Sequence, residues 1–77
     1  SVYIYRVIRQ ELAAPDLGRY ITYGIAALLV LAGQRQQVGF VADISPDRAA
    51  VQQLAERCNA EQLEPCQLLD VVEDSLV

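Results

Sequence analysis

Up to residue 44 the chain follows the pattern of apolar and polar positions that is typical of β-strands. Residues 2–12 are rich in β-branched and aromatic side chains, which favour an extended backbone and predict a first strand. Residues 20–32 and 38–44 predict a second and a third strand. Gly33 and the polar residues after it separate these two segments, so we expect a hairpin there instead of a continuous helix.

Two glycines and a proline mark places where the predicted strands turn or bend. Residues 14–18 contain Pro15, which presets φ, and Gly18, which accepts a positive φ. They predict the turn between the first two strands. Gly24 lies inside the second predicted strand, where a glycine indicates a bulge or the close approach of another backbone.

The pattern changes at residues 45–47, where three side chains favour the start of a helix. Ser45 can accept a hydrogen bond from a backbone N–H of the first turn, as a good N-cap does. Pro46 suits the first helical position, where no N–H is needed. Asp47 places a negative charge at the positive end of the helix dipole. We therefore expect a helix that begins within two residues of Pro46 and is capped by Ser45.

From this point the apolar residues recur at helical spacing. The first helix has one apolar face, formed by Val51, Leu54, Ala55 and Cys58. We expect Asn59 to end this helix in a left-handed conformation and residues 60–64 to form a short connection. Pro65 then opens a second helix. Its apolar face is formed by Leu68, Leu69, Val72 and Leu76.

The order of these elements predicts a fold class. We expect a single α+β domain over residues 1–77, built as a three-stranded antiparallel β-meander followed by two helices packed on one face of the sheet (βββαα).

Both faces of the predicted sheet are apolar. Two helices packed on one side can bury only one of these faces, so the other stays exposed to water. In the first strand, Val2, Ile4 and Ile8 alternate with Tyr3, Tyr5 and Val7. Soluble monomers rarely leave an apolar patch of several hundred Å² bare. We therefore expect a homodimer that joins sheet against sheet or strand edge to strand edge.

Composition narrows the choice of partners. The 77 residues are 53% hydrophobic and carry a net charge of −4. This balance argues against nucleic acid and against an anionic membrane surface as partners, because both select basic patches. Residues 20–34, the longest nearly uncharged run, are too few to span a bilayer. With no signal peptide visible at the start of the sequence, we expect a cytoplasmic protein.

The two cysteines leave three interpretations open. Cys58 belongs to the apolar face of the first helix and fits a small buried side chain. Cys66 lies in the first turn of the second helix, where the helix dipole can make a thiol reactive. A disulfide between the two is a third option, which a cytoplasmic setting disfavours. Two cysteines without any histidine do not make a four-ligand zinc site, so we predict no metal site.

The candidate interaction residues are tyrosines of the strands and acids of the second helix. The tyrosines are Tyr3, Tyr5, Tyr20 and Tyr23, either ordinary strand residues or part of an interface, where tyrosine is enriched. The acids are Asp70, Glu73 and Asp74, which share one helix face. Three interpretations of these acids stay open. They form a solvated surface, they pair with Arg6, Arg9 or Arg19 of the same or a second chain, or they bind Mg²⁺ or Ca²⁺.

No catalytic constellation is present in the sequence. It has no histidine, no glycine-rich phosphate loop and no paired nucleophile and base. We therefore predict no catalytic residues and no cofactor. The leading hypothesis is a non-enzymatic protein–protein interaction or regulatory module. The alternative is a small-ligand-binding domain, which a pocket lined by tyrosine hydroxyls and arginine would favour.

Several short motifs also resemble a known family. They are Tyr23-Gly24-Ile25, Asp43-Ile44-Ser45 with Asp47, Cys58-Asn59, Leu63 with Pro65, and Leu68-Leu69-Asp70-Val71-Val72-Glu73-Asp74 with Leu76. This pattern resembles a family of small bacterial proteins of unknown function found in clostridia-type Firmicutes. That family often has histidine at the position of Gln67 and an aromatic residue at that of Ser75. The resemblance implies a bacterial, cytoplasmic protein and no known activity.

Overall fold

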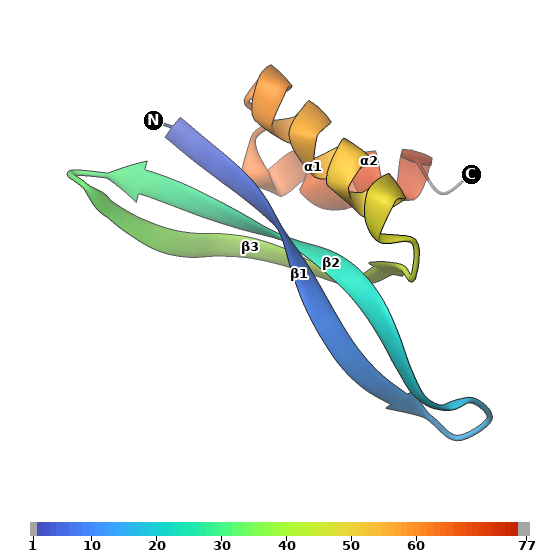
Figure 1. Ribbon diagram of the computed structural model, residues 1–77. Helices are drawn as coiled ribbons and strands as arrows, with labels where there is room; N and C mark the ends of the chain where they lie inside the picture. The colour runs from blue at the N-terminus through green and yellow to red at the C-terminus, as the bar shows by residue number, and fades with distance from the viewer. Residues whose placement is uncertain (1, 76–77) are drawn as a thin grey trace.

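The computed structural model describes residues 2–75 and has three antiparallel strands followed by two helices (Figure 1). The elements are β1 (Val2–Ala14), β2 (Gly18–Leu31), β3 (Gln34–Ser45), α1 (Arg48–Glu61) and α2 (Leu68–Ser75), with a short 3₁₀ turn at Pro65–Gln67. Neighbouring strands pair in the order β1-β2-β3. This arrangement confirms the predicted α+β meander and its two helices.

Each strand extends past at least one of its predicted ends, although β2 stops at Leu31, one residue short of its predicted end. The largest difference is in β3, which begins at Gln34 and not at residue 38, because its polar first residues pair with the end of β2. Main-chain hydrogen bonds of a hairpin form whatever the side chains are. Ala32 was predicted to lie in a strand. It lies instead in the tight turn with Gly33, where φ is 53° and 77° respectively, as a two-residue hairpin turn requires.

Gly24 lies where the register between β2 and β3 changes. Tyr23 pairs with Ser45 but Ile25 pairs with Val41, so three residues of β3 face this one glycine. A Cβ atom on Gly24 would clash with the backbone carbonyl oxygen of Val41. The predicted bulge and close backbone approach are thus confirmed, and a side chain at this position is excluded by space.

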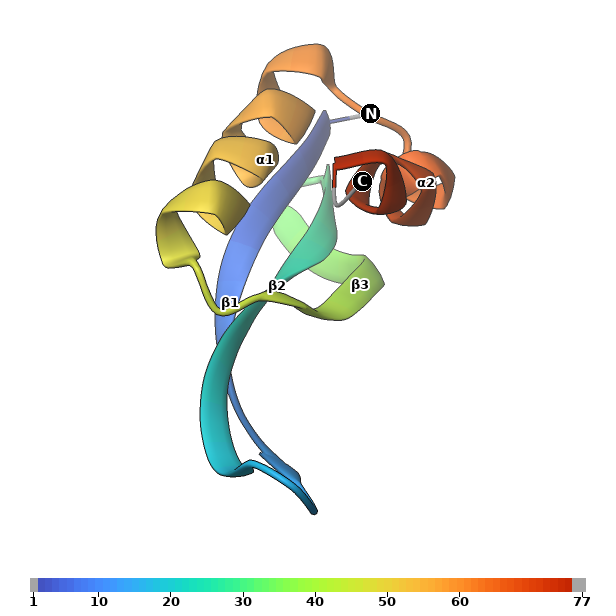
Figure 2. The same cartoon turned by 90° about the vertical axis from the view of Figure 1, so that its right-hand side faces the viewer.

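Both helices cover the same face of the sheet, and the core lies between them and the strands (Figures 1 and 2). The buried core residues are Tyr5, Ile25, Ala27, Ile44, Val51, Leu54, Ala55, Cys58, Leu68 and Val72. Pairing between β2 and β3 ends at Tyr23 and Ser45. Beyond this point β1 and β2 continue as a two-stranded ribbon that extends past the helices (Figure 1).

The N-cap of α1 is Asp47, which corrects the prediction of Ser45. The carboxylate Oδ1 of Asp47 accepts hydrogen bonds from the N–H groups of Ala49 and Ala50, at 3.1 and 3.3 Å. Ser45 is still part of β3, where it pairs with Tyr23, and so it lies too early to cap the helix. Its hydroxyl instead accepts a hydrogen bond from the N–H of Asp47 at 3.0 Å. The helix begins at Arg48, within the predicted two residues of Pro46.

The ends of the helices also differ from the prediction. Residue 62, not Asn59, takes the left-handed conformation after α1, with φ of 48°. In α2, Leu68 and Val72 are buried as expected, but Leu69 is 54% exposed. One residue along a helix turns the side chain by about 100°, which carries Leu69 off the face that Leu68 occupies. Leu76, the last residue of the predicted face, lies outside the described residues.

Candidate functional site

The sheet face that points away from the helices is largely apolar, and no helix within the described residues 2–75 covers it. Its large apolar side chains are Val2, Ile4, Ile8 and Leu12 of β1, Leu28 and Val30 of β2, and Phe40 of β3. We call this surface the open face. Val2 is 55% exposed, Phe40 42% and Ile8 37%, so water reaches several of these side chains. The prediction that the helices cover only one apolar face is confirmed.

A polar cluster on the open face holds the irregular part of β3 in place. Asp43 has a positive φ of 51°, and its N–H donates to Oε1 of Gln10 at 2.8 Å. The hydroxyl of Tyr20 donates to the Asp43 carboxylate at 3.0 Å, and this bond raises the pKa of Tyr20. Thr22 is buried beside them, and its hydroxyl has no hydrogen-bond partner among the described residues. These contacts fix the bulge and are structural.

Two amide side chains close the free edge of β1 near its start. One belongs to Asn59 in the last turn of α1, and the other to Gln62, the C-cap of that helix. Asn59 accepts from the N–H of Tyr5 at 2.7 Å and donates to the carbonyl of Tyr5 at 3.0 Å. Gln62 makes the equivalent pair of bonds with Tyr3, both at 3.1 Å. Each amide therefore takes the place of a neighbouring strand. Beyond Tyr5, no described residue bonds the outward backbone groups of this edge.

The four predicted tyrosines do not form one surface. Tyr3 and Tyr5 share the helix-covered face, where the Tyr5 hydroxyl donates to the carbonyl of Leu63 and that of Tyr3 donates to the Glu64 carboxylate at 3.3 Å. Burial raises the pKa of Tyr5 to about 12, and burial with the nearby Glu64 carboxylate raises that of Tyr3. Tyr23 packs against the core on this same face. Tyr20 lies on the open face, so it is separated from the other three.

The three acidic residues of α2 are exposed, and none of them forms an ion pair within residues 2–75. The ion pairs there join Arg19 to Glu11 and Arg57 to Glu61. The predicted pairing of Asp70, Glu73 and Asp74 with arginines of the sheet is therefore not found inside the described part of the chain. No group of three metal-ligating side chains is found there either.

Both cysteines are free thiols. Cys58 is 3% exposed, as predicted for the apolar face of α1, and burial raises the pKa of its thiol. Cys66 is exposed at the 3₁₀ turn before α2. The two therefore have different environments, one packed in the core and one in contact with water.

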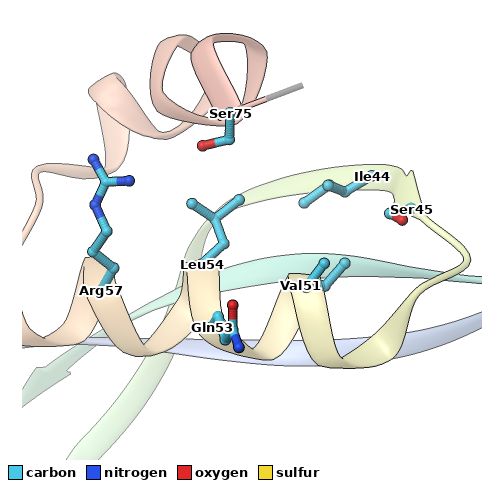
Figure 3. A pocket seen from close by; sticks show the side chains of 8 residues that line it. Ile44, Ser45, Val51, Gln53, Leu54, Arg57 and Ser75 are labelled. Carbon is cyan, nitrogen blue, oxygen red and sulfur yellow. The ribbon is translucent and has the colours of Figure 1, made fainter. Parts of the chain in front are cut away.

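A groove lies between α1, the end of β3 and α2 (Figure 3). Its volume is about 280 Å³, and its lining residues are Ile44, Ser45, Ala50, Val51, Gln53, Leu54, Arg57 and Ser75. Typical ligand pockets begin at roughly 300 Å³. The groove has one arginine and no tyrosine, so it is not the tyrosine- and arginine-lined pocket expected of a ligand-binding domain. Two more open hollows, of about 440 and 380 Å³, have no tyrosine in their lining either.

Sequence reasoning missed the side chains that close the β1 edge and fix the bulge. Asn59 and Gln62 are three residues apart, which places them on one side of α1. That spacing gives no sign that they face a strand edge, because the position of α1 along β1 depends on tertiary packing. Gln10 and Asp43 are 33 residues apart, and only the irregular register of β3 brings them together.

Comparisons with known proteins identify a family and no function. No described helix is long and apolar enough to cross a membrane. No curated protein and no solved structure matches the chain. A family model described as a family of unknown function, DUF6514, matches residues 1–77, and the chain therefore belongs to this family.

Proposed function

We propose that this protein is a non-enzymatic protein–protein interaction or regulatory module that acts as a homodimer. The observation that carries the proposal is the open face, where large apolar side chains of all three strands meet water. Burial of apolar surface is the main favourable term in protein association. The setting we propose is the bacterial cytoplasm, as the sequence resemblance implies.

Other functional classes have less support. The chain has no histidine, and the two hydroxyl–carboxylate pairs among its described residues join Tyr3 to Glu64 and Tyr20 to Asp43. The pKa of each tyrosine is raised, which is the opposite of what activates a nucleophile. Nucleic acid and anionic membranes are disfavoured partners because the net charge is −4. The six arginines are dispersed over strands and helix and form no basic stripe in the sequence. A protein surface, beginning with a second copy of the chain, is the partner that the apolar sheet fits.

Molar mass in solution tests the proposal. Light scattering after size exclusion, at micromolar to submillimolar protein, should give twice the 8.5 kDa of one chain. The apparent mass should fall on dilution if the dimer is reversible. An 8.5 kDa species over the whole concentration range would overturn the homodimer.

A further inference from the structure

The free edge of β1 is divided into a closed and an open part. The N–H and C=O groups of Tyr3 and Tyr5 point away from β2 and are bonded by Gln62 and Asn59. Outward-pointing backbone groups alternate along an antiparallel strand, so those of Val7, Arg9, Glu11 and Ala13 point the same way. No described residue bonds them. Residues 7–13 thus present an unpaired strand edge, which continues from the three-stranded part of the sheet onto the ribbon that extends past the helices (Figure 2).

The side chains of this open edge are complementary to themselves. When residues 7–13 are aligned antiparallel with a second copy about Gln10, Arg9 lies opposite Glu11 and Ile8 lies opposite Leu12. Val7 lies opposite Ala13, and Gln10 meets its own copy. Opposite charges and apolar pairs directly across an antiparallel ladder are both stabilising. Every position therefore meets a compatible partner, and the ion pair occurs twice by symmetry.

The same alignment ends where the edge itself is closed. The next outward pair would place Tyr5 opposite Pro15 of the other copy. The backbone of Tyr5 is already bonded by Asn59, and proline has no N–H to donate. Both ends of the ladder thus stop at the limits of the open edge.

We propose that residues 7–13 of β1 pair antiparallel with the same residues of a second copy, about a two-fold axis at Gln10, so that one sheet continues through the dimer. This inference rests on the proposed homodimer and assigns its contact to the free edge of β1, so that the open face stays available to a further protein partner. In an antiparallel ladder each outward-facing pair exchanges both of its main-chain hydrogen bonds. Addition of a strand to an exposed sheet edge is a common mode of protein recognition.

The charged groups at the edge are available for this contact. Arg9 forms no ion pair within the described residues. Glu11 lies 3.7 Å from a guanidinium nitrogen of Arg19, but the side chain of Arg19 is 85% exposed, so this pair is weak. Arg9 of one chain and Glu11 of the other would sit on the helix side of the ribbon, away from the core.

The shape of the molecule leaves room for the second copy. A two-fold axis perpendicular to the sheet keeps both helical layers on one side and both open faces on the other. Helix α1 reaches the β1 edge at Tyr3 and Tyr5, at the opposite end of the strand from the ribbon (Figure 1). Ile8 and Leu12 of the two copies would meet across the seam on the open face. The dimer would therefore enlarge that apolar surface for a further protein partner.

A charge exchange tests the pairing. The variants Arg9→Glu and Glu11→Arg each place like charges opposite one another twice, and we expect each to weaken the dimer at least about tenfold. The double variant R9E/E11R restores opposite charges and should recover most of the affinity. Arg6→Glu is the matched control, because Arg6 lies on the same strand and would face Ala14. It makes the same charge change and should have little effect on dimerisation at moderate salt.

A second variant tests the backbone contacts. Arg9→Pro removes an N–H that points away from β2, so it leaves the β1–β2 ladder intact while removing two hydrogen bonds from the symmetric dimer. We expect at least about a tenfold loss of affinity, with an unchanged circular dichroism spectrum. Amide exchange at Arg9 and Glu11 should slow as the protein concentration rises.

The outcomes separate this inference from the proposed homodimer. A dimer that keeps its affinity in R9E, E11R and R9P would overturn the edge pairing while the homodimer stands. A dimer weakened by Asp74→Arg and not by R9E would also overturn it, since α2 packs beside β3 at the other edge of the sheet. A wild-type protein that stays monomeric at all concentrations overturns both.

Discussion

The side-chain amide of Asn59 bonds the backbone of Tyr5 as a neighbouring strand would, accepting from its N–H at 2.7 Å and donating to its carbonyl at 3.0 Å. This pair of bonds ties the last turns of α1 to the edge of β1. It also prevents another strand from pairing at this point. One residue thereby fixes the position of the helix on the sheet and limits how far the strand edge stays open.

Replacing Asn59 should therefore destabilise the fold. We expect Asn59→Ala to lower the free energy of unfolding by about 1–3 kcal/mol, because it leaves a partly buried N–H and carbonyl of Tyr5 without partners. Gln62→Ala, the matched control, removes bonds to the more exposed Tyr3 and should cost less. Urea denaturation measures both. Equal losses for the two variants would show that burial at Tyr5 does not matter.

The helix cap gives a second comparison. Asp47→Ala should lower the stability by about 1 kcal/mol, because the N–H groups of Ala49 and Ala50 lose their acceptor. Ser45→Ala removes only an acceptor for the N–H of Asp47, in a position already held by pairing with β2, and should cost less. Denaturation midpoints of the two variants decide between the caps. A larger loss for Ser45→Ala would contradict the cap at Asp47.

The two cysteines should respond differently to the same substitution. Cys58→Ser places a hydroxyl in the apolar contact between α1 and the sheet, and should cost about 1–3 kcal/mol of stability. Cys66→Ser should be nearly neutral because that side chain is exposed. Both variants make the same chemical change, and they differ only in that Cys58 is buried and the control, Cys66, is exposed. Equal, negligible shifts of the denaturation midpoint would mean that Cys58 does not pack in the core.

The sequence predicted those parts of the fold that depend on local patterns. Alternation in the strands, Pro15 with Gly18 in the turn, and the apolar face from Val51 to Cys58 are signals carried within a few residues. The start of α1 was predicted to within two residues for the same reason. Its cap was not, because Ser45 has good cap chemistry but remains paired with β2. The pairing of Ser45 with Tyr23 keeps Ser45 in the strand, so Asp47, two residues later, caps the helix.

The candidate surface was predictable only in part. An apolar sheet face without a helix over it follows from alternation, since both faces of the strands carry large apolar side chains. The tyrosines could not be assigned to it, because only the packing of α1 decides that Tyr5 is buried and Tyr20 is not. The closed and open parts of the β1 edge depend on Asn59 and Gln62, which reach the strand across more than 50 residues of chain.

The pH dependence of stability gives a last prediction, centred on the buried Tyr5. Burial raises its pKa to about 12, whereas in the unfolded chain it is close to 10. Between these values the unfolded state releases a proton that the folded state keeps, so the stability falls as pH rises from about 10 to about 12. Below about pH 10 this contribution is fully present.

Tyr5→Phe separates this effect from other alkaline titrations. The variant loses the hydrogen bond to the Leu63 carbonyl and should be less stable than the wild type by about 1–3 kcal/mol at neutral pH. It cannot ionise at residue 5, so the gap between the two proteins should narrow as pH rises through the window from about 10 to about 12. Tyr3 and Tyr20, whose pKa values are also raised, remain in both proteins and affect both curves. Urea midpoints measured from about pH 8 upward give the comparison, and two parallel curves would show that Tyr5 ionises alike in the folded and unfolded chains.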